Sequence, residues 1–81
     1  MMNSILCELL GVSEHIRKSD NSKYYSIRVI SDNRISVMFF KEKELFDGLS
    51  KLERLAPINL FGDLRIKDET SFIFYPKSFE V

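Results

Sequence analysis

The sequence has little of what small proteins use to build covalent or metal-based cross-links. Its 81 residues include one cysteine, Cys7, one histidine, His15, and no tryptophan. A single cysteine excludes an internal disulfide, and one cysteine with one histidine excludes a zinc site built from these residue types. We therefore expect a fold that depends on its hydrophobic core, with no metal and no cofactor.

Glycine, proline and long apolar runs are also scarce. Three Gly and two Pro argue against a disordered or collagen-like chain. No apolar run approaches the roughly 20 residues that a membrane-spanning helix needs. The opening residues 1–7 contain no basic residue and are followed by Glu8, unlike a secretory signal peptide. We expect a cytoplasmic protein without membrane contact.

The chain carries no net charge, because 12 Lys and Arg residues balance 12 Asp and Glu residues. A neutral chain exerts no long-range attraction on phosphate, which argues against nucleic-acid binding. Its length is about half the 150 residues of a common domain, so we expect one domain over residues 1–81. A domain this small has little room for both a core and an enclosed active-site cavity.

The first half of the sequence has the pattern of three antiparallel strands. The segment 4–15 is apolar and mixed, and Gly11 in its middle suits a bulge or bend. After a turn over 19–22, the segment 23–31 alternates, with Tyr25, Ile27 and Val29 on one face. Asp32-Asn33 forms a tight reversal because both residues tolerate positive φ. A third strand follows over 35–40.

The hydrophobic period then changes from strand to helix. Leu45, Leu49, Leu52 and Leu55 recur at helical spacing and predict one helix of about three turns. Gly48 inside this helix predicts close packing at that point, since glycine costs about 1 kcal/mol relative to alanine there. Pro57 ends the helix.

Two further strands are expected after Pro57. The segment 58–66 alternates, a turn follows over 68–70, and the last strand is 72–75, before Pro76. The predicted class is mainly β with one α-helix, in the order β-β-β-α-β-β.

The residues predicted to form the core are Phe39, Phe72, Phe74, Leu45, Leu49 and Leu52. Phe40 and Phe46 fit a core, a binding surface or an oligomer contact equally.

This order resembles the OB fold, a five-stranded, partly open Greek-key barrel with a helix between its third and fourth strands. Within that fold, the chain is similar to the small single-stranded DNA-binding proteins of phages and mobile elements. The local likeness is the segment 22–26 (SKYYS), which opens the second strand after a loop with Arg17 and Lys18. The resemblance implies sequence-tolerant binding of single strands, often by a homodimer or larger homo-oligomer.

OB folds bind ligands on the face of strands two and three, between the first and last hairpin loops. Single-strand binders there use aromatic rings for base stacking and cations for phosphates. On that assumption the exposed face carries Tyr24, Ser26 and Arg28 together with Ser36, Met38 and Phe40. The predicted nucleic-acid-binding residues are Arg17, Lys18, Lys23, Tyr24, Arg28, Arg34 and Phe61. Phe61 is included because it is an aromatic on a polar face, which also fits a subunit interface.

Three other interpretations stay open. The first is that the same surface binds RNA, an alternative that differs from the DNA hypothesis only in the substrate. A protein-interaction or adaptor subunit with an OB-like barrel would use Phe61, Tyr75 or the region of Phe40 and Phe46 as its contact. An enzyme is disfavoured, since the sequence has no Gly-rich phosphate loop and no nucleophile with a base at a recognisable spacing. His15 is predicted to be an ordinary surface residue, and Cys7 a buried one.

Overall fold

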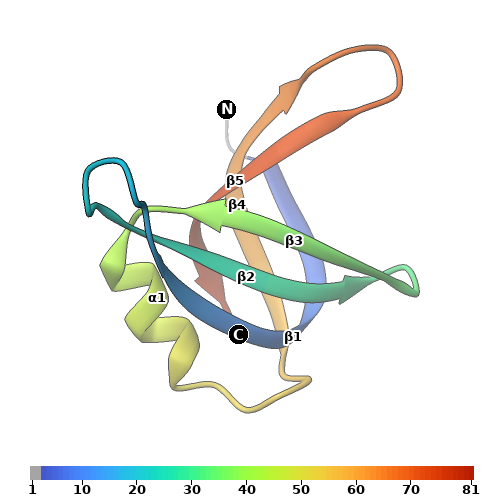
Figure 1. The fold of residues 1–81 in the computed structure, drawn as a ribbon. Coiled ribbons are helices and arrows are strands. Elements are labelled where there is room, and N and C mark those ends of the chain that lie inside the picture. The colour runs from blue at the N-terminus through green and yellow to red at the C-terminus, as the bar shows by residue number, and fades with distance from the viewer. Residues whose placement is uncertain (1–2) are drawn as a thin grey trace.

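The computed structural model describes residues 3–81, and its elements follow the predicted order (Figure 1). Five strands form one antiparallel sheet, with a single helix between the third and the fourth strand. The elements are β1 (Asn3–Ile16), β2 (Lys23–Ser31), β3 (Arg34–Phe40), α1 (Lys43–Ser50), β4 (Pro57–Ile66) and β5 (Phe72–Glu80). The predicted class, mainly β with one helix, is confirmed.

β1 is the central strand, and it divides its hydrogen bonding between two partners. Its first half pairs with β4, from Asn3 opposite Gly62 to Glu8 opposite Pro57. Its second half pairs with β2, and the register shifts between Leu9 and Gly11. The bulge predicted at Gly11 is therefore present, at the point where the strand changes partner and the sheet bends.

The sheet curls until its two edge strands face each other without closing. The strand order is β3-β2-β1-β4-β5, and β3 lies near β5. Among residues 3–81, no hydrogen-bonded ladder joins these two strands. The predicted barrel is thus partly open, and we call the line where β3 and β5 face each other the seam.

The β2–β3 hairpin corrects our assignment of faces. Asp32 and Asn33 have φ values of 51° and 62°, as a tight two-residue turn requires. This turn pairs Ser31 with Arg34, and therefore Ile27 with Met38 and Tyr25 with Phe40. Met38 and Phe40 are buried, whereas Phe39 is 52% exposed. Our placement of Met38 and Phe40 on the binding face, and of Phe39 in the core, was wrong.

The helix is shorter than predicted. It has 8 residues and ends at Ser50, so Leu52 and Leu55 lie beyond it. The chain instead turns back to β1, where the Leu55 N–H donates to the Leu9 carbonyl and the Leu9 N–H donates to the Ala56 carbonyl. Leu55 has a φ of 68°, which a right-handed α-helix does not allow. Pairing with β1 has replaced the last helical turn.

The core lies between the concave side of the sheet and α1. Leu45 and Leu49 of the helix are buried there with Ile27, Val29 and Leu60. Gly48 permits the close packing expected of it, because a Cβ there would lie 2.9 Å from Cε1 of Phe79. Phe46 stacks on Tyr25, with 4.6 Å between ring centroids.

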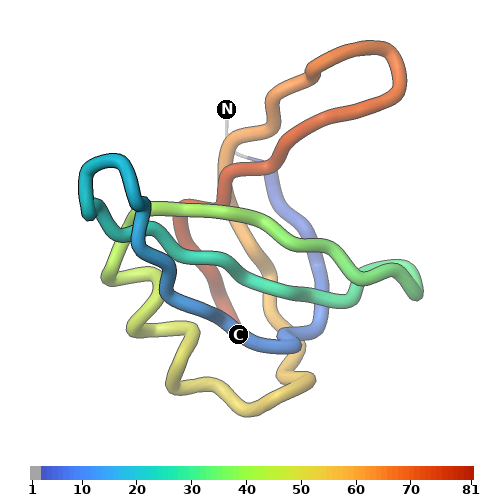
Figure 2. Tube along the Cα trace, in the orientation of Figure 1, coloured from blue at the N-terminus to red at the C-terminus, as the bar shows by residue number. Residues whose placement is uncertain are grey.

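The β4–β5 hairpin extends beyond the body of the sheet as an arm (Figures 1 and 2). β5 does not end before Pro76 as predicted, but continues to Glu80. A register shift between Phe61 and Gly62 accommodates the buried Pro76 opposite Gly62. Phe74 is core as predicted, but Phe72 is 62% exposed, because it lies on the arm, where no second layer covers it.

Candidate nucleic-acid interface

Three aromatic rings lie together on the convex face of the sheet. The ladders place His15 opposite Tyr24, and Ser26 opposite Phe39. The rings of His15 and Tyr24 stack with centroids 4.9 Å apart, and Phe39 lies 6.1 Å from Tyr24 and 6.4 Å from His15. We call His15, Tyr24 and Phe39 the aromatic patch. Phe39, at 52% exposure, is an open ring in a place where bases can stack.

A buried hydroxyl holds the patch in place. Ser26 was predicted on the exposed face, but it lies buried under the rings at 6% exposure, and its Oγ is 2.8 Å from Nε2 of His15. This hydrogen bond satisfies the buried hydroxyl of Ser26 and orients the imidazole on which Tyr24 stacks. His15 is therefore part of the patch and not the isolated surface residue that we predicted.

A groove follows the seam and connects the patch to both ends of the open sheet. It consists of two hollows, of about 1000 Å³ and about 360 Å³, that share Phe39 and Tyr75. Apolar side chains form its middle, including Val37, Phe72 and Phe74. Charged side chains lie at its ends: Arg34 together with Asp32 in the larger hollow, and Arg17, Lys41 and Lys77 together with Glu42 in the smaller one.

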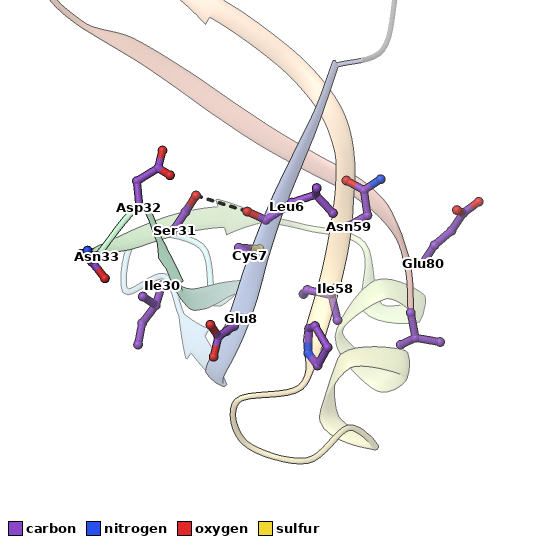
Figure 3. A pocket seen from close by; sticks show the side chains of 12 residues that line it. Leu6, Cys7, Glu8, Ile30, Ser31, Asp32, Asn33, Ile58, Asn59 and Glu80 are labelled. Atoms are coloured by element: carbon purple, nitrogen blue, oxygen red, sulfur yellow. Dashed lines mark hydrogen bonds between the residues drawn. The ribbon is translucent and has the colours of Figure 1, made fainter.

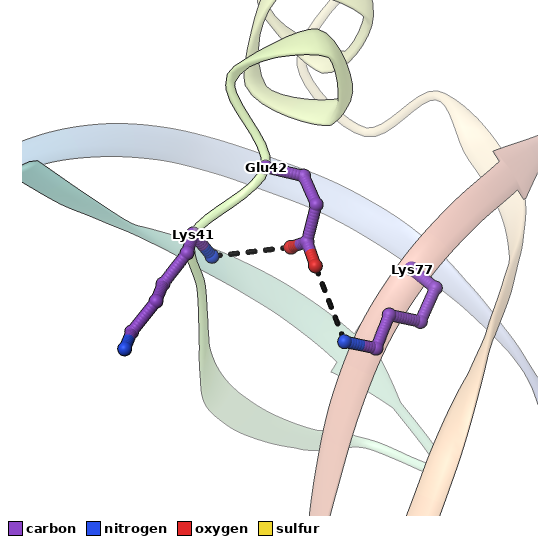
Figure 4. A network of polar contacts seen from close by, with 3 residues as sticks. All are labelled: Lys41, Glu42 and Lys77. Carbon is purple, nitrogen blue, oxygen red and sulfur yellow. Dashed lines mark hydrogen bonds and ion pairs between the residues drawn. The ribbon is translucent and has the colours of Figure 1, made fainter.

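The cations of the smaller hollow are not equivalent. Arg17 lies beside the patch, with its Cζ 5.9 Å from the centre of the Tyr24 ring. Lys77 is paired with Glu42, with 3.2 Å between Nζ and Oε1 (Figure 4). Outside the groove, Lys23 is paired with Glu14, also at 3.2 Å. Both pairs are largely solvated, and such pairs contribute little to stability.

The structure brings together only some of the predicted site residues. Arg17 and Tyr24 lie at one end of the groove, and Arg34 lies in its other hollow. Lys18 and Lys23 are exposed in and beside the loop after β1 but line neither hollow.

Two predicted residues lie away from the groove. Arg28 shares the convex face of β2 with Tyr24, as predicted, but its Nη2 lies over Gly11 of β1. Phe61 lies half-buried on β4, and β1 separates β4 from β2 in the sheet.

Several residues that line the groove were missing from the predicted site, among them Phe39, Tyr75, Lys41 and Lys77. The two-residue turn contained the signal for Phe39, because it fixes which residues of β3 share a face with Tyr24. Lys41 and Lys77 belong to segments that meet only when the sheet curls, so no local pattern marks them.

Another hollow, of about 650 Å³, lies where β1 passes from β4 to β2 (Figure 3). Glu8, Asp32 and Glu80 line it, which makes it unsuited to a phosphate. Cys7 also lies there, and burial raises the pKa of its thiol to about 11. Its thiol is therefore protonated at neutral pH and is a poor nucleophile.

Known structures give an independent view of the fold. Two of them are crystal structures, Form 1 and Form 2, of Rim1, a mitochondrial single-stranded DNA-binding protein from S. cerevisiae. Form 1 has a TM-score of 0.74 and 15% identity, covering 100% of this chain and 94% of that chain. Form 2 has a TM-score of 0.74 and 15% identity, covering 98% and 90%. No protein-family model and no curated protein matches the sequence.

The chain has an OB fold. Its first hairpin loop is therefore the segment 17–22, beside the aromatic patch, and its last is the segment 67–71, at the tip of the arm. At 15% identity or below, the likeness shows the fold alone, and it gives no support to the phage or mobile-element type. Over residues 3–81, no helix has the length and apolar character to cross a membrane.

Proposed function

We propose that this chain binds single-stranded DNA without sequence preference, along the seam groove. The observation that carries the proposal is Phe39, a half-exposed ring at the junction of the two hollows. Bases would stack there, because every base has a flat face, while Arg17, Lys41 and Arg34 would contact phosphates at the ends. The OB fold shared with a mitochondrial single-stranded DNA-binding protein supports this assignment.

The remaining predicted contacts belong to the same proposal. Lys18, Lys23 and Arg28 would extend the strand's path beyond the groove, on the convex face and the loop after β1. Phe61 would contact nucleic acid only if the strand continues around β4. A non-enzymatic role, a homodimer or larger homo-oligomer, and a cytoplasmic location stay predictions, as does an origin in a phage or mobile element.

Because the chain has no net charge, its affinity for single strands should depend only weakly on salt. With about three unpaired cations in the groove, the slope of log K against log salt should be about −2, since each phosphate contact to a single strand contributes about −0.7. Stacking, which salt does not screen, should supply most of the affinity. A homo-oligomer would raise the affinity further through avidity.

The first test is fluorescence anisotropy with a labelled dT oligomer of about 30 nucleotides at about 50 and 300 mM salt, with a duplex of equal length as comparison. We expect binding to the single strand, a shallow salt dependence and no binding to the duplex. The same titration with single-stranded RNA separates the two nucleic acids. No binding to dT at tens of micromolar protein would contradict the proposal.

A matched pair of variants then tests the site. Phe39→Leu should weaken dT binding about tenfold, because stacking contributes roughly 1–3 kcal/mol per base, and leucine keeps the apolar cover. Phe61→Leu removes a ring outside the groove, and with a dT oligomer too short to continue around β4 it should bind like the unmodified protein. Equal losses in the two variants would mean that the groove is not the site.

A protein-interaction role is the second candidate, and one observation favours it. The inner face of the arm exposes Leu64, Ile66 and Phe72 by 40%, 77% and 62%. Exposed apolar patches of this kind mark interaction surfaces. This role predicts that the molecular mass in solution rises with protein concentration. If dT binding that depends on salt is also absent, the interaction role replaces the first proposal.

A further inference from the structure

The smaller hollow of the groove contains an anion where the proposed function needs cations. Arg17, Lys41 and Lys77 line it together with Glu42. Three positive charges and one negative charge leave a net +2 in this hollow. Since a phosphate backbone would have to pass close to the Glu42 carboxylate, this residue requires its own explanation.

Glu42 is held by two contacts, both drawn in Figure 4. Its Oε1 lies 3.2 Å from Nζ of Lys77, and its Oε2 accepts the backbone N–H of Lys41 at 3.1 Å. Partial burial raises the pKa of this carboxyl, but hydrogen bonds from its own backbone, Lys77 and Lys41 outweigh burial and lower the pKa. The carboxylate is therefore charged at neutral pH and forms an ion pair with the Lys77 ammonium group.

The pair is built so that it can open. The side chains of Lys77 and Glu42 are 43% and 41% exposed, so water can replace either partner. Glu42 precedes α1 as its N-cap residue but makes no side-chain capping hydrogen bond to the helix. Lys77 can thus leave Glu42 without disturbing the helix or the strand.

We propose that Glu42 is an internal competitor of the DNA phosphate for Lys77, and that it sets the affinity and the salt dependence of the groove. This inference rests on the proposed single-strand binding. In the free protein Lys77 is neutralised by Glu42, and a DNA phosphate can contact Lys77 only by displacing this carboxylate, so that most complexes of the unmodified protein form without that contact. The exchange leaves Glu42 without a cation beside a polyanion, which weakens binding and favours release.

Glu42→Gln is the direct test, because the amide keeps the shape and can still accept the Lys41 N–H. We expect dT binding to tighten about three- to tenfold at 50 mM salt. The slope of log K against log salt should steepen by about 0.7, the value for one additional phosphate contact. Glu53→Gln makes the same change in net charge at a residue that lines none of the described hollows, and it should bind like the unmodified protein.

Lys77→Gln identifies the cation that Glu42 controls. In the unmodified background Lys77→Gln should change the affinity for dT less than twofold, because Lys77 is already paired with Glu42. In the Glu42→Gln background it should abolish the gain. If Glu42→Gln does not fold by circular dichroism, Glu42→Ser serves instead, since serine is a preferred N-cap residue.

The two proposals fail in different ways. If the unmodified protein binds no dT oligomer, the proposed function is contradicted and this inference falls with it. If the unmodified protein binds dT but Glu42→Gln matches Glu53→Gln or binds more weakly, only the competitor role is overturned. A gain that persists in the double variant also overturns it, because Lys77 would then not be the controlled cation.

Discussion

The two walls of the seam groove come from hairpins built in different ways. The β2–β3 hairpin has a two-residue turn and an uninterrupted register from Tyr25 opposite Phe40 to Ser31 opposite Arg34. The β4–β5 hairpin has a five-residue connection, 67–71, and a register shift at Gly62. The first wall is therefore specified by a local turn, whereas the second depends on one bulge and on packing far from the loop.

The largest effect should come from breaking the irregular wall. A Cβ at Gly62 would collide with the carbonyl oxygen of Tyr75 and lie 2.9 Å from Cα of Pro76. Both atoms belong to the backbone, so the strands would have to separate. We expect Gly62→Ala to destabilise the fold by about 3 kcal/mol, the upper end for overpacking. In a domain of this size that lowers Tm by more than about 10 °C in a thermal melt followed by circular dichroism.

Gly11→Ala is the matched control in the other bulge of the sheet. A Cβ there would meet only Nη2 of Arg28, at 3.2 Å, and this atom is the far end of a flexible side chain. Its expected effect is within about 0.5 kcal/mol, as for most surface substitutions. If both variants melt at similar temperatures, the close approach of β4 and β5 at Gly62 is not what holds the second wall.

The two walls should also differ in how much each contributes to dT binding, and this effect is smaller. Tyr75 faces Phe39 across the junction of the two hollows, but Arg65 lies over its ring at 5.5 Å, so one side is already occupied. We expect Tyr75→Leu to weaken dT binding about fivefold, less than Phe39→Leu, because stacking is worth roughly 1–3 kcal/mol per base for an open ring.

Tyr75→Phe shows whether the ring or the hydroxyl matters at this position. It keeps the ring and should retain the affinity of the unmodified protein in the same anisotropy titration. Equal losses for Tyr75→Phe and Tyr75→Leu would assign the contact to the hydroxyl. Unchanged binding of Tyr75→Leu would mean that the strand follows only the β3 wall.

The same contrast explains what could be predicted from the sequence. In β2 the alternation of Tyr25, Ile27 and Val29 with polar neighbours separates the two faces, and this assignment was confirmed. In β3 the more apolar face, with Ile35, Val37 and Phe39, is the exposed one, so alternation alone chooses the wrong face. The turn decides, because two residues between the strands place Ile27 opposite Met38 and turn Phe39 outward.

Other features of the fold and of the site could not be predicted from the local sequence pattern. The helical spacing of Leu45, Leu49, Leu52 and Leu55 is real, yet Leu55 bonds to Leu9 of β1 and the helix ends earlier. Pro76 looked like the end of β5 but lies opposite Gly62 at a register shift of an edge strand, where proline is tolerated. Such outcomes depend on contacts between distant segments, as does the meeting of Lys41 and Lys77 in the groove.

The smallest effect concerns the turn that specifies the regular wall. Asn33 has a φ of 62°, a conformation that glycine adopts more readily than asparagine. We expect Asn33→Gly to stabilise the fold by about 0.5 kcal/mol, which raises Tm by about 2–4 °C and leaves dT binding unchanged.

Asn33→Val supplies the opposite case, because a β-branched residue strongly disfavours positive φ. It should lower Tm, and it should also weaken dT binding, since a hairpin that leaves this turn loses the register that points Phe39 outward. A valine variant with lower Tm but unchanged affinity would show that β2 and the core hold β3 in register without the turn. The position of the stacking ring would then be set by packing on both walls, and the contrast between the two hairpins would not extend to binding.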